Sequence, residues 1–117
     1  MSFDWKEYIK LAENLIKQNN EACFRSGISR AYYGVFCIAR NMAGYKNMKG
    51  AKVHKKVIDH YRDSSISWEQ YVGNILDQLR KLRNEADYDE EKVITYDLAQ
   101  RVLIKSKDIL KKLKVKI

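Results

Sequence analysis

Residues 21–43, EACFRSGISRAYYGVFCIARNMA, are the longest stretch of this chain with a helical pattern of apolar side chains. Apolar residues recur there at steps of four and three, the spacing that brings side chains onto one face of a helix. The two adjoining stripes contain Phe24, Ile28, Ala31, Val35, Ile38 and Met42, and Tyr32, Phe36, Ala39 and Ala43. Gly27 and Gly34 lower the helix propensity, so we expect another element to approach closely at both. We therefore predict that this stretch is the central, most buried helix.

The segments on both sides repeat the helical pattern. They predict four further helices, over about 5–19, over 51–62, from 67 to about 88, and from Asp89 or Glu90 onward with Val93 on the apolar face. No segment alternates with the period of a strand, and the chain has no proline to interrupt a helix. The sequence thus predicts an all-α fold with one domain over 1–117, an antiparallel up-down four-helix bundle with an additional short helix between the second and fourth helical segments.

Three of the predicted helix starts carry residues typical of helix caps. Asp4 with Glu7, and Ser67 with Gln70, have the three-residue spacing of a capping box. Asn19 and Asn20 end the first predicted helix and are both candidates to cap the helix over 21–43. We expect these residues to define where the three helices begin.

Composition excludes several classes of protein. No stretch approaches the roughly 20 apolar residues of a membrane span, and the acidic and polar N-terminus is unlike a signal peptide, so we expect a cytoplasmic protein. Cys23 and Cys37 lie fourteen residues apart in one predicted helix, about 21 Å, which is too far for a disulfide. Neither they nor the two histidines have a zinc-binding spacing, and the sequence predicts no metal and no cofactor.

The formal net charge is +8, from 23 basic and 15 acidic residues. The C-terminal end, 105–117, holds six lysines and one aspartate, and a second basic group surrounds Gly50 and consists of Lys46, Lys49, Lys52, Lys55 and Lys56. Such a balance attracts polyanions such as RNA, and it also favours solubility. Charge alone leaves both interpretations open.

Residues 79–89, LRKLRNEADYD, gather unlike polar groups at a predicted helix end. Positions four apart are neighbours on a helix, so Asp87 lies next to Arg83 and Tyr88 next to Asn84. A guanidinium, an amide, a carboxylate and a phenol on one short ledge suit contact with a phosphate or a nucleotide without a metal. The alternative is an ordinary solvated helix end.

Arg30 stands within the most apolar predicted helix, in the stretch SRAYYG. Burial of an arginine is costly unless it is paired. One interpretation is a structural ion pair with Asp77 or Asp87, and the other is a guanidinium that lines the same polar pocket as Arg83. Of the adjacent Tyr32 and Tyr33, one should pack inside and the other should border the pocket.

The two histidines offer a further choice. Both are expected to be exposed or to cap a helix, and His54 draws more interest because it stands within the basic group. It is a candidate to border the same polar pocket.

The stretch SRAYYGVF over 29–36, His54 after it, and RNEADYD over 83–89 together resemble the HEPN domain family, and in particular its small stand-alone members. The resemblance covers about residues 5–110. It implies a four-helix bundle that forms a homodimer with polar clefts at the dimer interface. Many family members are metal-independent ribonucleases with an arginine, a polar residue and a following histidine. Arg83 and Asn84 match the first two positions, whereas Asp87 and Tyr88 stand where the histidine is expected.

The resemblance also implies a partner, a minimal nucleotidyltransferase in a toxin–antitoxin-like system, with Tyr88 as the candidate AMP acceptor. We therefore expect a protein that binds nucleotide or RNA in a cleft. The expected binding residues are Arg30, Tyr33, His54, Arg83, Asn84, Asp87 and Tyr88. The first alternative is a metal-independent endoribonuclease with Arg83 and Asn84 as catalytic residues, and the second is a structural interaction bundle.

Overall fold

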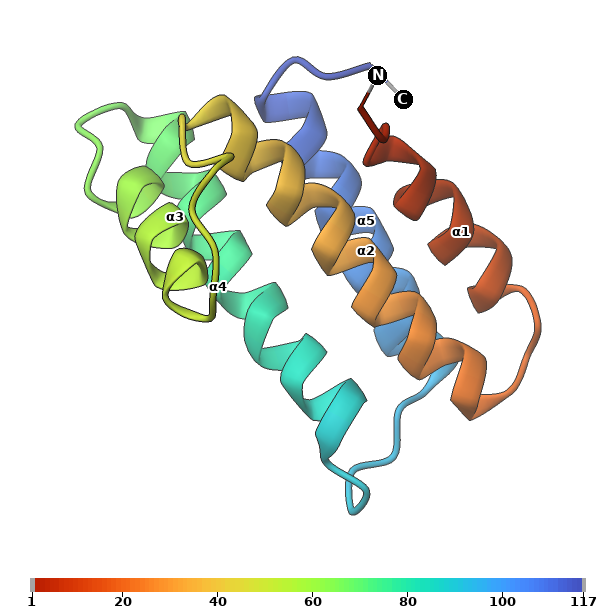
Figure 1. Cartoon of the computed structure of the whole chain (residues 1–117). Coiled ribbons are helices and arrows are strands. Elements are labelled where there is room, and N and C mark those ends of the chain that lie inside the picture. The colour runs from red at the N-terminus through yellow and green to blue at the C-terminus, as the bar shows by residue number, and fades with distance from the viewer. Residues whose placement is uncertain (1, 117) are drawn as a thin grey trace.

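The computed structural model describes residues 2–116, and within that range all regular structure is helical. The five helices, shown in Figure 1, are α1 (Lys6–Ile16), α2 (Glu21–Met42), α3 (Lys52–Arg62), α4 (Ser67–Tyr88) and α5 (Tyr96–Lys112). The prediction of an all-α helical bundle with a short helix before α4 is therefore confirmed.

Helix α2 is the centre of the bundle, as its two apolar stripes predict. It packs against all four other helices, with α1 on one side and α4 and α5 on the others (Figure 1). Ile28, Ala31, Tyr32 and Val35 have no exposed surface. Met42 is the exception, because it is the last residue of the helix and is 55% exposed. The wide apolar arc of α2 thus forms the core to which the other helices are attached.

Two glycines of α2 allow α1 to lie close to it. A Cβ atom added at Gly27 would lie 2.8 Å from Cγ1 of Ile16, and one added at Gly34 would lie 2.8 Å from Cδ1 of Ile9. Real Cβ atoms do not lie so close to a neighbour, so a larger residue at either position would require the isoleucine of α1 to shift. The expected close approach is confirmed.

The predicted caps hold at one of the three helix starts. The side chain of Asn20 accepts a hydrogen bond from the amide of Cys23 at 2.9 Å, which confirms it as the cap of α2. The Asp4–Glu7 capping box is wrong, since Trp5 at the start of α1 already has helical dihedral angles and Asp4 instead accepts from the amide of Lys6 at 3.0 Å.

At α4 the predicted Ser67–Gln70 capping box is also wrong. Ile66 occupies the cap position, and the hydroxyl of Ser64 accepts a hydrogen bond from its amide at 3.0 Å. Gln70 donates from its side chain to the carbonyl of Ser64 at 2.6 Å. The residue at the cap position of α4 is therefore Ile66, one residue before the Ser67 that the capping pattern predicts.

The last helix begins later than predicted. Helix α4 ends at Tyr88, residues 89–95 form a loop, and Thr95 caps α5 by accepting from the amide of Leu98 at 3.2 Å. Val93, expected on the apolar face, is 71% exposed, whereas Ile94 is 2% exposed. The reason is tertiary, because Arg25 of α2 binds the carbonyls of this segment and holds it out of a helix.

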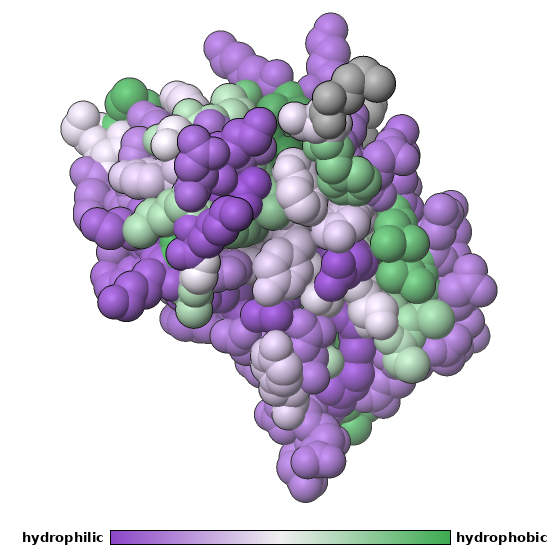
Figure 2. All heavy atoms as spheres, in the orientation of Figure 1, coloured by the Kyte–Doolittle hydropathy of each residue, from purple (hydrophilic) through white to green (hydrophobic). Residues whose placement is uncertain are grey.

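The surface agrees with a basic, polar protein. Figure 2 shows that hydrophilic residues cover most of the face viewed there, with hydrophobic groups scattered among them. None of the described helices combines the length and the apolar character that crossing a membrane demands. Cys23 and Cys37 are both free thiols, as their distance along α2 predicts.

Candidate functional site

The last turns of α4 hold the guanidinium of Arg83 among three polar partners. Its Nε donates to Oδ2 of Asp87 at 2.8 Å, Nη1 donates to Oδ1 of Asn84 at 3.0 Å, and Nη2 donates to the hydroxyl of Tyr88 at 3.3 Å. The side chain of Arg83 is only 14% exposed. The four residues predicted to share a ledge therefore form one hydrogen-bonded group, with the arginine at its centre.

Two residues of helix α2, Ser29 and Tyr33, also contact this group. The hydroxyl of Ser29 donates to Oδ2 of Asp87 at 3.1 Å, so one carboxylate oxygen joins α2 to Arg83. The ring of Tyr33 lies under the guanidinium, with Cζ of Arg83 4.8 Å from the ring centroid. Cζ of Arg83 also lies 5.4 Å from the ring centroid of Tyr88, so the guanidinium contacts two aromatic rings.

Arg30 lines the same group and has no acidic partner among the described residues. Its Cζ lies 5.6 Å from the centroid of Tyr33 and 4.9 Å from that of Tyr8. The predicted ion pair is wrong, because Asp77 pairs with Arg62 and Lys81, and Asp87 pairs with Arg83. The aromatic faces of the two tyrosines take the place of a carboxylate.

His54 enters from α3 and is half-buried, so the expectation that it is exposed or caps a helix is wrong. Its Nδ1 shares a hydrogen bond of 2.7 Å with the hydroxyl of Tyr32, and its ring stacks on Phe36 with centroids 4.2 Å apart. The ring of Tyr33 meets it edge-on at 6.0 Å. Tyr32 is thus the tyrosine that packs inside, and Tyr33 is the one that borders the polar group, as predicted. His60 is exposed.

The charges around His54 reveal an arginine that the sequence reasoning missed. Burial lowers the pKa of His54 to about 4, and the positive charges of Arg80 and then Arg83 contribute to the decrease. Arg80 lies three residues before Arg83 on α4, so the helical spacing that joined Arg83 to Asp87 also indicates Arg80. Arg30 contacts the same Tyr33 ring, so three guanidinium groups lie in or near this group, whereas its one carboxylate is that of Asp87. The positive charges therefore outnumber the negative charge.

A second missed residue, Arg25, holds the end of α4 in place. Its guanidinium donates to the carbonyls of Ala86 and Asp89, both at 3.0 Å, and to that of Lys92. Glu21 orients it through a bond of 3.0 Å and also accepts from the amide of Ile94 at 3.2 Å. The Ile94 amide and then Arg25 lower the pKa of Glu21. The i, i+4 spacing of Glu21 and Arg25 indicates only an ordinary helical ion pair, so nothing local predicts these long-range contacts.

Asp87 and Tyr88 also line an open hollow of about 580 Å³ beside this clamp, together with Glu21, Arg25, Ala86 and Glu90. Tyr88 is 73% exposed, so its ring can move without breaking the core. Within residues 2–116, no group of three histidine, cysteine or acidic side chains is arranged to hold a metal ion. Chemically, the arrangement offers hydrogen-bond donors, aromatic faces and positive charge.

The half-buried His54 makes the stability of the fold depend on pH. The unfolded chain binds a proton at this imidazole below about pH 6.5, whereas the folded chain binds it only below about pH 4. Between these values the unfolded state holds more protons, so the free energy of unfolding falls as the pH falls. Because solvent screens a half-buried ring, we expect a loss of about 1 kcal/mol between pH 7 and pH 5.

Urea unfolding at those two pH values measures this loss. In a His54→Phe variant the ring stacked on Phe36 remains but cannot titrate, and every other ionisable group is shared with the wild type. The variant is expected to lose less stability than the wild type over the same pH interval. Equal losses in the two proteins would contradict the assignment to His54.

Comparison of the chain with protein-family models, with curated proteins and with solved structures finds no match in any of the three.

Proposed function

We propose that this protein is a HEPN-domain protein that binds nucleotide or RNA in a polar cleft formed by Arg83, Asn84, Asp87 and Tyr88. Arg30, Tyr33 and His54 border the cleft. The proposal includes the antiparallel up-down arrangement of the four long helices, a homodimer, and a cytoplasmic location. It rests on the motifs SRAYYGVF and RNEADYD, which resemble those of the family.

The observation that carries the proposal is the environment of the Arg83 guanidinium. It is 14% exposed, is oriented by three hydrogen bonds and contacts two tyrosine rings, so its direction is set before any ligand arrives. A guanidinium has five N–H donors, and these three bonds leave donors free for a phosphate oxygen. Arg30 and Arg80 add positive charge, which draws a phosphate toward the site.

The position of His54 supports the ribonuclease alternative, whereas the pKa of its imidazole argues against it. A histidine does stand beside Arg83, but it comes from α3 and not from the position after Asn84. Its imidazole, with a pKa of about 4, is neutral at pH 7 and is a weak base. Proton transfer is most efficient when the pKa lies near the working pH. We therefore favour binding over cleavage.

The proposed partner is a minimal nucleotidyltransferase, and Tyr88 is the proposed acceptor of AMP. Its hydroxyl is bound only to Nη2 of Arg83 among the described residues, and its ring is 73% exposed, so an enzyme can reach it. Intact mass after co-expression with such a transferase tests this step. A Tyr88→Phe chain that gained the same mass of AMP would rule out Tyr88 as the acceptor.

Replacement of Arg83 tests the binding site itself. We expect Arg83→Gln to weaken binding of AMP and of a fluorescein-labelled oligouridine of twelve nucleotides by about tenfold, because a charged donor to phosphate is lost. Fluorescence anisotropy in the presence of EDTA, with AMP as the competitor, gives both affinities. The exposed Arg101 provides a matched control, since Arg101→Gln removes the same charge elsewhere.

The possible results separate the three functions. Equal affinities of Arg83→Gln and Arg101→Gln would overturn the site assignment. A lower melting temperature of Arg83→Gln, with no ligand bound by the wild type, would favour the structural interaction bundle. Shortening of the labelled RNA by the wild type, with EDTA present and not with Arg83→Gln, would establish the ribonuclease.

A further inference from the structure

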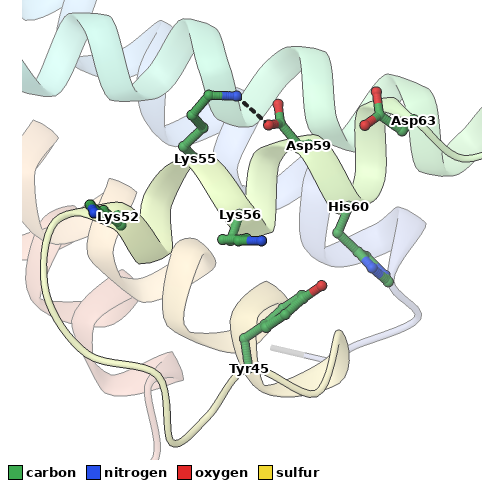
Figure 3. A pocket seen from close by; sticks show the side chains of 7 residues that line it. All are labelled: Tyr45, Lys52, Lys55, Lys56, Asp59, His60 and Asp63. Carbon is green, nitrogen blue, oxygen red and sulfur yellow. Dashed lines mark hydrogen bonds and ion pairs between the residues drawn. The ribbon is translucent and has the colours of Figure 1, made fainter.

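A second hollow, of about 660 Å³, lies between α3 and the loop that follows α2. Figure 3 shows the side chains that line it, which are Tyr45, Lys52, Lys55, Lys56, Asp59, His60 and Asp63. Its size lies within the range of small-molecule sites, about 300–1,000 Å³. His54 is two residues from Lys56 and therefore points to the opposite side of α3. The hollow is thus separate from the cleft around Arg83.

Except for Lys55, the basic side chains of this hollow lie on a different side of α3 from the acidic side chains. Lys52, Lys56 and His60 follow one another at four-residue steps, which aligns them along one stripe of α3. Figure 3 shows Lys56 and His60 on the side of the ribbon that faces Tyr45. Neither Lys52 nor Lys56 forms an ion pair with a described residue. Two ammonium groups are therefore available to an anion.

The acidic residues that line the hollow do not neutralise this stripe. Asp59 pairs with Lys55 one turn before it. In Figure 3 both carboxylates, of Asp59 and Asp63, lie on the side of α3 away from Tyr45. The stripe that faces the loop thus keeps its positive charge.

Two aromatic rings, those of Tyr45 and His60, lie on the same side of α3 as the lysine stripe, and together they are called the aromatic corner. Tyr45 and His60 meet edge-on, with centroids 5.8 Å apart and planes at 82°. Tyr45 packs against the core, and the exposed His60 also meets the ring of Tyr61, with centroids 5.0 Å apart. In Figure 3 the phenol of Tyr45 extends toward His60. An aromatic corner beside unpaired cations is the combination that binds single-stranded nucleic acid, in which bases stack and phosphates follow positive charge.

We propose that this hollow binds a nucleotide of single-stranded RNA. A base packs against Tyr45 and His60, and the adjoining phosphates follow Lys56 and Lys52 along α3. An acidic peptide would use the two lysines but would leave the aromatic corner without a matching group. The inference shares only the class of ligand with the proposed function, and its residues are separate from Arg83 and its partners.

Binding of a fluorescein-labelled twelve-residue oligouridine tests this site, by anisotropy in EDTA over a range of salt. The Lys52→Gln/Lys56→Gln variant is expected to raise Kd about tenfold and to reduce the slope of log K against log salt by about 1.4, since each phosphate contact on a single strand contributes about 0.7. Lys10→Gln/Lys17→Gln is the matched control, because both of its lysines are exposed, lie outside the two basic groups and give an equal charge change. The control is expected to change Kd less than twofold.

A second variant tests the aromatic corner without a change at the lysines. His60 is exposed, so His60→Ala is expected to fold normally. It should weaken binding of the oligouridine about fivefold and leave binding of an abasic oligomer of equal length unchanged, because only a base can stack. Equal losses for the two oligomers would overturn the stacking assignment.

The remaining outcomes are also decisive. No binding of the oligouridine by the wild type, or equal effects of the two double-lysine variants, would overturn the inference. If Arg83→Gln binds as the wild type does while Lys52→Gln/Lys56→Gln binds weakly, the proposed cleft fails and this site stands. If only Arg83→Gln binds weakly, the reverse holds.

Discussion

Arg25→Met is expected to lower the free energy of unfolding by about 3 kcal/mol, as measured by urea unfolding at pH 7. The substitution keeps most of the apolar stem and removes the guanidinium, which is bonded to the carbonyls of Ala86, Asp89 and Lys92. The last carbonyls of a helix have no partner within the helix, and Arg25 supplies one for the end of α4. The side chain of Arg25 is 21% exposed, so water replaces only part of what is lost.

Arg101→Met is the matched control for this prediction, because Arg101 is exposed and the charge change is the same. We expect its effect to stay within about 0.5 kcal/mol of the wild type. Hydrogen exchange should quicken in the Arg25→Met variant at residues 86–95, the segment that the clamp holds. Similar stabilities of the two variants would show that the guanidinium of Arg25 contributes little.

The clamp also bears on the proposed binding site. Asp87 and Tyr88 belong to the last turn of α4, between the carbonyls that Arg25 binds. Loss of the clamp leaves that turn free to fray, and the partners of Arg83 fray with it. Arg25 is therefore a positioning residue for the cleft, although it lies on α2.

Gly73→Ala is expected to lower the free energy of unfolding by about 2–3 kcal/mol. A Cβ atom at this position of α4 would lie 2.5 Å from the backbone nitrogen of Arg62 and 3.0 Å from its Cα. These atoms belong to the last turn of α3 and cannot turn aside as a side-chain tip can. Helices α3 and α4 would have to separate, and the short helix that carries His54 would shift with respect to the core.

The expected decrease in the free energy of unfolding is opposite in sign to the usual effect of this substitution. In an exposed helix interior, replacement of glycine by alanine is stabilising by about 1 kcal/mol. A more stable Gly73→Ala variant would therefore show that α3 does not lie against this residue. Asn74→Ala, at the exposed neighbouring position, controls for the effect of alanine in this turn.

The parts of the candidate site that could be predicted belong to one helix. Arg83, Asn84, Asp87 and Tyr88 are neighbours because helical spacing brings positions three and four apart together, and that spacing is present in the sequence itself. Arg80 follows from the same rule and was overlooked. The pairing of Ser29 with Asp87 and the approach of His54 to Tyr32 depend on how helices pack, and no local pattern contains that information.

The starts of the helices also divide into those that the local sequence predicts and those that tertiary contacts decide. Asn20 caps α2 because an asparagine side chain can reach the amide of Cys23 within its own turn. At Asp89 the local pattern allows the chain to begin a new helix at once. Contacts with Arg25, more than sixty residues earlier, hold it as a loop until Thr95.

By itself, the sequence determined the all-helical class, the central position of α2 and the polar ledge at the end of α4, because each follows from periodicity along a single segment. Only the tertiary structure decided that Arg30 contacts tyrosine rings and pairs with no acid among the described residues, that Arg25 clamps the end of α4, and that Tyr45 meets His60 edge-on beside a hollow. Those contacts join residues from separate segments. Their partners are selected by the packing of the whole core, in which burial and shape outweigh local preference.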